Sequence, residues 1–123
     1  MKKILTAALL GLSLNSFADD APLWLRFSAI SPDGQTIAFS YKGDIFSVPV
    51  NGGTAKQLTT NSAYDAYPVW SPDGQKIAFA STREGSMDVY LMDKNGGVPK
   101  RLTTNSGSET PMAFTDNSHV LFT

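Results

Sequence analysis

The stretch Ser-Pro-Asp-Gly-Gln-Lys-Ile-Ala-Phe at residues 71–79 repeats the stretch Ser-Pro-Asp-Gly-Gln-Thr-Ile-Ala-Phe at residues 31–39, 40 positions earlier. Three further segments follow each copy in the same order: an Asp before two hydrophobic residues, an Asn-Gly-Gly triplet, and a Leu-Thr-Thr-Asn segment. In these three segments, corresponding residues of the two copies lie 44 positions apart. A third, less regular copy begins with Pro111 and has Asp116 43 positions after Asp73. A fixed period of about 20–50 residues is typical of repeat proteins, in which one supersecondary unit recurs.

Each copy reads as short strands separated by turns. Proline presets the backbone at the first central position of a tight turn, aspartate tolerates the second, and glycine closes it. Residues 77–81 then alternate between alanine and other side chains, which is the period of a strand, and residues 88–92 are rich in β-branched and aromatic residues. The Asn-Gly-Gly triplet predicts another reversal, and residues 100–103 a short fourth strand. We interpret the repeated turn residues as structural: Ser31, Pro32, Asp33, Gly34, Ser71, Pro72, Asp73 and Gly74.

Four strands in roughly 40–45 residues match the blade of a β-propeller, whereas helical repeats of similar length lack paired glycine turns and β-branched runs. We therefore predict an all-β fold: a partial β-propeller with two four-stranded antiparallel blades and the start of a third, after an N-terminal signal helix. A closed propeller needs at least about four blades, so we expect a truncated sequence. The predicted division is a signal peptide at residues 1–18, a lead-in segment at 19–26, blade 1 at 27–68, blade 2 at 69–111 and the start of blade 3 at 112–123.

The third copy departs from the repeat at its turn. Thr115 replaces the proline and Asn117 replaces the glycine. Asparagine tolerates the left-handed backbone that glycine adopts in such turns, so the turn is expected to survive.

The first eighteen residues have the order of features found in a secretion signal. Lys2 and Lys3 supply a positive start, residues 4–14 form a short apolar run, and the small residues Ser16 and Ala18 precede the expected cleavage site. The apolar run is too short to span a bilayer, which needs about 20 residues. The sequence therefore predicts export, with a buried N-terminal helix as the alternative.

Charge and composition exclude several kinds of partner. Removing Lys2 and Lys3 from the 10 basic residues leaves 8 against 11 acidic ones, which excludes a strongly basic nucleic-acid-binding face and a polybasic membrane patch. We expect no nucleic-acid partner, no membrane partner after signal cleavage, and no cofactor. The chain has no cysteine, so its stability must come from sheet packing and not from disulfides.

Residues 70–81 resemble the repeat of the WD-like propellers in TolB and the tricorn proteases. The full repeat of those families continues with a glycine-containing loop, an Asp-Ile-Tyr strand, a Gly-Gly turn and an Arg-Leu-Thr strand, matched here at residues 83–85, 88–90, 96–97 and 101–103. Other segments are more specific to one branch. Residues 22–27, 40–46, 63–65 and 109–115 resemble the N-terminal propeller of secreted tricorn-like serine peptidases from Gram-negative bacteria.

This resemblance implies a much longer protein, in which two propellers precede a PDZ module and a peptidase domain. The first propeller of that family lines a route between solvent and the catalytic chamber, and the nucleophilic serine lies far downstream, so no catalytic residue is implied here. The implied location is the periplasm or the exterior, and the implied partners are the remaining blades, the downstream peptidase domain of the same protein, and peptide substrates of the full-length form. The alternatives are a non-enzymatic TolB-like periplasmic protein-binding propeller and the propeller of a prolyl-oligopeptidase-type enzyme.

The serine, aspartate and histidine residues do not form a pattern that predicts catalysis. Ser31 and Asp33 recur with each blade, as turn residues do, and His119 falls at a turn edge expected to face solvent. The acidic residues lack the spacing of a metal-binding loop, so no metal site is predicted. Asp44 and Asp88 begin equivalent strands, and we interpret them as caps of a neighbouring turn.

The best binding candidates lie in two corresponding hairpin loops of unequal length, because loops on a rigid scaffold often carry function. Tyr41 and Lys42 belong to the first loop, and Arg83 and Glu84 belong to the second. The repeated aromatic residues are expected to pack one blade on the next, whereas Trp24 and Tyr64 fall outside that shared core and are expected to line a surface.

Overall fold

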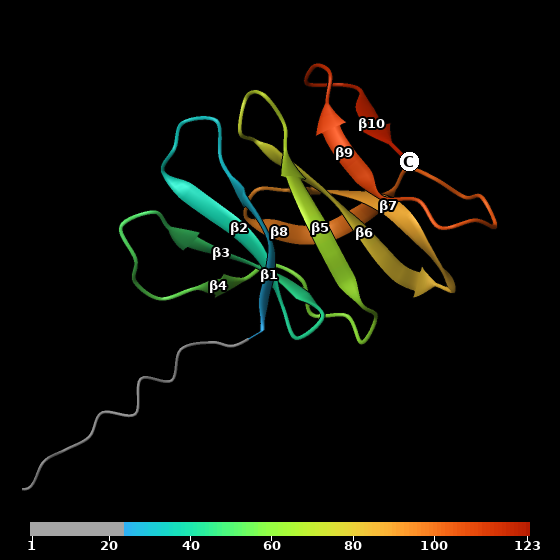
Figure 1. Cartoon of the computed structure of the whole chain (residues 1–123), viewed down its shortest axis with the longest axis horizontal. Helices are drawn as coiled ribbons and strands as arrows, with labels where there is room; N and C mark the ends of the chain where they lie inside the picture. The colour runs from blue at the N-terminus through green and yellow to red at the C-terminus, as the bar shows by residue number, and fades with distance from the viewer. Residues whose placement is uncertain (1–23) are drawn as a thin grey trace, which may run out of the picture.

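The computed structural model describes residues 24–123. The predicted signal peptide therefore lies outside the described residues, as does most of the lead-in segment. Every helix or strand assigned in the described range is a β-strand, and that range contains no helix suited to crossing a membrane. Figure 1 shows three sheets that follow one another across the molecule in sequence order.

The first two sheets are four-stranded, and each strand pairs antiparallel with the next strand along the chain. Sheet 1 contains β1 (Leu25–Ile30), β2 (Thr36–Tyr41), β3 (Asp44–Pro49) and β4 (Lys56–Gln57), and sheet 2 contains β5 (Asp65–Trp70), β6 (Lys76–Glu84), β7 (Ser86–Asp93) and β8 (Gly96–Arg101). Sheet 3 pairs β9 (Pro111–Phe114) with β10 (Val120–Phe122). The predicted all-β partial propeller, with two four-stranded blades and the start of a third, is confirmed. The exact division of the chain into blades stays a prediction.

The Ser-Pro-Asp-Gly stretch closes the first hairpin of both complete sheets with the same hydrogen bonds. In sheet 2, the Ser71 hydroxyl donates to Asp73 Oδ1 at 2.6 Å, and the Gly74 amide donates to the Ser71 carbonyl oxygen at 2.8 Å. Gly74 has a φ of +67°, a left-handed conformation that glycine adopts at no steric cost. The Ser31 hydroxyl likewise donates to Asp33 at 2.6 Å. Each aspartate thus organises its own turn.

The turn of sheet 3 forms in a different way. Asn117 is not among the described residues with positive φ, so its backbone does not copy the glycine that it replaces. Its side-chain oxygen instead accepts a hydrogen bond from the Asp73 amide at 2.9 Å. The Asp116 carboxylate accepts hydrogen bonds from the amides of Ser118 and His119 at 2.7 and 2.8 Å. Asn117 therefore links the third turn to the second.

The hydrophobic core lies between sheets 1 and 2. Sheet 1 and the segment after it contribute the smaller side chains Ala38, Ile45 and Leu58. Sheet 2 contributes the larger side chains, Ile77, Phe79, Tyr90 and Met92. Each of these core side chains is at most 5% exposed. Burying each large side chain stabilises the fold by about 1.5–3 kcal/mol. The Trp70 indole N–H donates to the Ala29 carbonyl oxygen at 3.0 Å, which ties the first strands of the two sheets together.

The first strand of each complete sheet carries a bulge with an aromatic residue in an unusual conformation. The pairing of β1 and of β5 shifts register midway, and at these points Phe27 has a φ of 51° and Tyr67 a φ of 58°. Positive φ is uncommon for bulky side chains. The two ring centroids lie 4.0 Å apart, so the equivalent bulges bring equivalent aromatic rings together between the blades.

Candidate functional site

The first candidate hairpin is a two-residue turn at the tip of β2 and β3. Lys42 and Gly43 have φ values of 51° and 89°, and they connect the paired residues Tyr41 and Asp44. Positive φ at both central residues is the pattern of a type I′ turn, one of the two turns favoured in hairpins of this length. The Tyr41 ring packs edge-on against Phe46 with centroids 5.8 Å apart, and the Lys42 ammonium lies 5.3 Å from the Tyr41 ring. Tyr41 is thus fixed on the sheet, and exposed Lys42 remains available for a ligand.

The second candidate hairpin directs its arginine inward. Arg83 binds the Asp65 carboxylate at 3.1 and 3.2 Å, and its Nε donates to the Ser81 hydroxyl at 2.9 Å. The guanidinium also lies 5.5 Å from the Phe79 ring and 4.7 Å from the Tyr90 ring. Only 13% of the Arg83 side chain is exposed, and Asp65 is fully buried. These contacts make Arg83 an internal anchor of sheet 2.

The two hairpins therefore offer different chemistry, and their residues border different pockets. Arg83 lies beside a pocket that includes Thr60 and Val98, whereas Lys42 borders one with Tyr64. Glu84 is exposed at the end of β6. A ligand-binding role for these residues stays a prediction, and Lys42 is the better candidate because it is exposed, whereas Arg83 is largely buried and already paired with Asp65.

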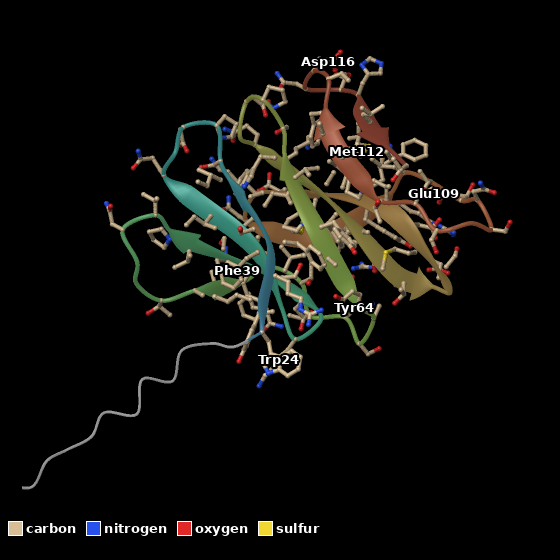
Figure 2. The ribbon with its side chains drawn as sticks, in the orientation of Figure 1. Trp24, Phe39, Tyr64, Glu109, Met112 and Asp116 are labelled. Carbon is tan, nitrogen blue, oxygen red and sulfur yellow. The ribbon has the colours of Figure 1, made fainter. Side chains whose placement is uncertain are left out.

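A pocket of about 290 Å³ lies at the tip of the first hairpin. We call it the Trp24–Tyr64 pocket, and its lining residues are Trp24, Arg26, Ser40, Lys42, Gly43 and Tyr64. Figure 2 shows Trp24 and Tyr64 at the same end of the molecule. Trp24 is 60% exposed and Tyr64 is 42% exposed. The expectation that these two aromatic residues line a surface matches their positions.

The Trp24–Tyr64 pocket combines aromatic walls with positive charge. The Arg26 guanidinium lies 5.8 Å from the Trp24 ring, Lys42 contributes an ammonium group, and no carboxylate lines the pocket. The Ser40 hydroxyl is buried there and has no hydrogen-bond partner in the described part of the chain. Such a pocket suits a ligand with an apolar surface and a negative charge. The aromatic rings would cover the apolar surface of the ligand, and the two cations would attract its negative charge.

The polar residues considered for catalysis are engaged elsewhere. The His119 Nδ1 lies 2.8 Å from Asp116 Oδ2, while the hydroxyls of Ser31 and Ser71 donate within their own turns. Serine and histidine therefore do not meet in a nucleophilic arrangement at these positions. Within residues 24–123, no group of three or more His, Cys, Asp or Glu side chains is placed to hold a metal ion.

Asp44 and Asp88 hold the segment that follows the third strand, a role more specific than the turn caps expected from the sequence. Asp88 binds Arg101 at 2.7 Å and accepts a hydrogen bond from the Thr103 hydroxyl at 3.4 Å. Asp44 accepts hydrogen bonds from Gln57 at 3.1 Å and Thr59 at 3.2 Å. Burial raises the pKa of Asp44, and the Thr59 hydrogen bond partly opposes that increase. The signal in the sequence is the equal spacing from Asp to Thr in both repeats.

Glu109 occupies the place in the third repeat that Asp65 occupies in the second. Asp65 is the first residue of β5, and Glu109 lies two residues before the start of β9. Both residues are buried, with exposed fractions of 0% for Asp65 and 6% for Glu109. The Glu109 Oε2 atom has no hydrogen-bond partner among the described residues. The same structural position therefore holds a paired carboxylate in sheet 2 and an unpaired one beside sheet 3.

Comparison with known proteins matches a family model over most of the chain. The family model described as the tricorn protease N-terminal beta propeller domain matches residues 22–123. Tricorn protease homolog 1 of Streptomyces coelicolor is 39% identical over 71 residues, covering 58% of this chain and 6% of that protein. Dipeptidyl-peptidase 5 of Porphyromonas gingivalis is 43% identical over 106 residues, covering 77% of this chain and 16% of that protein. The chain thus spans less than a fifth of the length of these two relatives.

Solved structures share the fold. The crystal structure of the tricorn protease aligns with a TM-score of 0.57 and 26% identity, over 67% of this chain and 8% of that chain. TolB from Acinetobacter baumannii aligns with a TM-score of 0.61 and 28% identity, over 72% of this chain and 23% of that chain. The predicted resemblance to tricorn-type and TolB-type propellers is confirmed, and because the family model covers most of the chain, we conclude that this chain belongs to the family of tricorn protease N-terminal beta propeller domains.

Proposed function

We propose that this chain forms part of the N-terminal propeller of an exported tricorn-like serine peptidase, and that proteolysis belongs to a longer protein. The observation that carries the proposal is the family match over residues 22–123. The relatives named as a tricorn protease homolog and a dipeptidyl-peptidase support the peptidase. The signal-like order of charge, apolar run and small residues at residues 1–18 supports export to the periplasm or the exterior.

In this proposal the propeller is a rigid scaffold that guides peptides toward or away from the catalytic domain. The Trp24–Tyr64 pocket is the contact point, because aromatic rings offer apolar area on a fixed framework. Lys42 and Arg26 favour peptides that carry acidic groups. The sheets supply the rigidity, since the core between sheets 1 and 2 is at most 5% exposed.

Labelling with a fluorophosphonate, which reacts with nucleophilic serine, tests the peptidase assignment. The product of the complete gene is expected to be labelled and to hydrolyse fluorogenic peptides, whereas the 123-residue chain alone is expected to do neither. A complete gene product that folds, but is neither labelled nor active on a broad peptide library, contradicts the proposal.

A pair of substitutions in the complete gene product tests the contact role of the pocket. Lys42→Ala and Trp24→Ala are expected to raise KM for acidic peptides several-fold and leave kcat nearly unchanged, because a distant binding contact acts on ground and transition state alike. Val98→Ala is the matched control, because Val98 is 97% exposed and lies outside the pocket. Equal KM values for all variants would remove the pocket from the proposal and leave the peptidase assignment intact.

A non-enzymatic protein-binding propeller is the second candidate. The observation that favours it is the match to a Protein TolB homolog of Chlorobium luteolum, 32% identical over 66% of this chain and 21% of that protein. This candidate predicts a complete gene product that is not labelled by fluorophosphonate and that retains a stable protein partner during purification.

A further inference from the structure

The first hairpin turns of the three sheets lie along one edge of the molecule (Figure 1). We call the turn between β1 and β2 turn 1, the turn between β5 and β6 turn 2, and the turn between β9 and β10 turn 3. Each turn lies beside the next. A Cβ at Gly74 of turn 2 would lie 3.6 Å from Pro32 of turn 1, and Asn117 of turn 3 bonds to the Asp73 amide of turn 2. The edge therefore contains two successive junctions between turns.

A carboxamide fills the junction between turns 2 and 3. The Asn117 Oδ1 atom accepts a hydrogen bond from the Asp73 amide at 2.9 Å. The residue of turn 2 that corresponds to Asn117 is Gly74, 43 positions earlier, which has no side chain to offer. The Asp33 amide of turn 1 corresponds to the Asp73 amide, and it donates to no residue in the described part of the chain. The junction between turns 1 and 2 thus lacks the acceptor that the other junction has.

The two aspartate amides are held in the same way. In both turns the aspartate Oδ1 atom accepts hydrogen bonds from the serine hydroxyl at 2.6 Å and from the amide of the residue two positions later at 3.0 Å. The glycine amide of each turn also donates to the serine carbonyl oxygen at 2.8 Å. Because the same bonds fix both turns, the Asp33 N–H faces turn 2 as the Asp73 N–H faces turn 3.

A groove with a volume of about 560 Å³ lies at the junction between turns 1 and 2. We call it the turn groove, and its lining includes Asp33 of turn 1, Gly74 of turn 2, and Val48 and Trp70 of the adjoining strands. Its volume is in the range of sites that bind small ligands. The groove lies between two consecutive four-stranded sheets, both of which the structure describes, and it is separate from the end faces of the molecule.

The charges of the turn groove favour a neutral acceptor. Asp33 and Asp73 contribute two carboxylates, and Lys94 contributes one ammonium group. Hydrogen bonds from the serine hydroxyls hold the pKa values of both aspartates below their usual value, so both carboxylates are charged at neutral pH. A carboxylate ligand would meet a net negative groove. A carboxamide brings an acceptor oxygen without a negative charge, as Asn117 does at the next junction.

We propose that the turn groove binds a peptide segment that presents an asparagine or glutamine side chain, whose carboxamide oxygen accepts a hydrogen bond from the Asp33 amide. The ligand oxygen takes the place that Asn117 Oδ1 takes beside Asp73. Trp70 and Val48 supply the apolar surface against which the rest of the segment packs. The turn groove and the Trp24–Tyr64 pocket lie at opposite ends of β2, so this inference is independent of the peptidase assignment.

An NMR titration of the ¹⁵N-labelled chain with three blocked peptides tests the proposal. Acetyl-Ala-Asn-Ala-amide is expected to shift the Asp33 amide resonance in a saturable manner and to leave that of Asp73 nearly unchanged, because Asn117 already occupies the Asp73 amide. Acetyl-Ala-Asp-Ala-amide adds a charge, and acetyl-Ala-Ala-Ala-amide keeps only backbone carbonyls. Each of these two is expected to bind about tenfold more weakly than the asparagine peptide.

A pair of glycine substitutions tests the location of the site. Gly74→Asn places a carboxamide of the chain itself into the junction, where its Cβ makes an ordinary contact with Pro32, and asparagine tolerates the positive φ. Gly34→Asn is the matched control, because Gly34 has a φ of +70° and a Cβ there would meet nothing within 4 Å. Gly74→Asn is expected to weaken binding of the asparagine peptide about tenfold or more, and Gly34→Asn is expected to bind like the unchanged chain.

The dispersion of the remaining amide resonances verifies that each variant is folded. If Gly74→Asn does not fold, the three peptides on the unchanged chain decide the question. An Asp33 resonance that does not move, or an asparagine peptide that binds no better than the other two, would overturn the proposal. Unweakened binding by folded Gly74→Asn would overturn it as well.

Discussion

Arg83 and Asp65, 18 positions apart in the chain, form an ion pair with Nη2 and Oδ2 separated by 3.1 Å. The pair ties the β6–β7 hairpin to the first strand of the same sheet, and the guanidinium covers the rings of Phe79 and Tyr90. Because those rings pack on sheet 1, the hairpin insertion that distinguishes the second blade from the first also stabilises the contact between the blades.

Removing one member of this pair is expected to cost much more than removing both. Arg83→Met leaves the fully buried Asp65 carboxylate unpaired, and the free energy of unfolding is expected to fall by about 3–5 kcal/mol. The double variant Arg83→Met with Asp65→Asn is expected to recover part of that loss. Urea unfolding measures both values. Lys42→Met in the corresponding hairpin is the control, with a change within about 0.5 kcal/mol; an equally large effect there would show that hairpin chemistry and not the buried charge is responsible.

Glu109 is expected to respond in the opposite direction. Its carboxylate is buried and its Oε2 atom has no partner among the described residues, so Glu109→Gln removes an uncompensated charge. The free energy of unfolding at neutral pH is expected to rise by on the order of 1 kcal/mol. The matched substitution Asp65→Asn is expected to destabilise the chain, because it leaves Arg83 without its anion. Parallel urea titrations of the two variants compare the signs, and a loss of stability in Glu109→Gln would mean that Glu109 has a cationic partner.

Gly96 and Gly52 occupy equivalent positions in the repeat. Comparing an alanine substitution at each position distinguishes the cost of backbone strain from the cost of steric crowding. Both have positive φ, but a Cβ at Gly96 would lie 2.8 Å from the Leu58 carbonyl oxygen, whereas a Cβ at Gly52 would meet nothing within 4 Å. Gly52→Ala is expected to cost about 1–2 kcal/mol from the left-handed backbone alone. Gly96→Ala is expected to cost a further 1–3 kcal/mol or so, because the neighbouring blade must shift. Thermal melting of both variants checks the difference, and equal melting temperatures would contradict the close approach of the blades.

The turn aspartates predict how stability depends on pH. Hydrogen bonds from the Ser31 and Ser71 hydroxyls, and then from the Gln35 and Gln75 amides, hold the pKa values of Asp33 and Asp73 below the ordinary 3.8. Their contribution to stability is complete above the unfolded pKa and is lost as the pH falls through the lower folded pKa. Asp33→Asn and Asp73→Asn are therefore expected to lower the melting temperature near neutral pH, and to differ less from the unchanged chain well below pH 3.8.

Asp44 is the internal contrast for these two residues. Burial raises the pKa of Asp44, so folding favours the protonated form of this carboxyl group. The contribution of Asp44 to stability is therefore complete below the unfolded pKa and is lost as the pH rises through the raised folded pKa. Asp44→Asn is thus expected to show the opposite trend in melting temperature against pH. Parallel profiles for all three variants would mean that the turn hydrogen bonds do not control acid stability.

The pattern of the repeat was sufficient to predict the blade architecture and the turn chemistry of the two complete sheets, but not how the turn of sheet 3 forms. Turn residues and strand alternation are local signals, and Ser71–Asp73–Gly74 behaves in the structure as the local stereochemistry of those residue types requires. The family resemblance rested on the same local signals and was confirmed by the match over residues 22–123. The sequence also marked both hairpin loops as candidate sites, but residue type alone could not distinguish an exposed cation such as Lys42 from a buried one such as Arg83.

The sequence by itself determined the strands, their turns and the order of the blades, because these depend on neighbours a few residues apart. Only the tertiary structure decided that Arg83 turns inward to Asp65, that Trp24 and Lys42 border one pocket, and that Gly96 must remain a glycine beside Leu58. Each of these depends on contacts between segments distant in the chain, whose geometry is set by how one twisted sheet packs on the next. Side chains with the same local pattern, such as Phe46 and Tyr90, therefore differ in burial because sheet 1 covers Tyr90, whereas no described sheet covers Phe46.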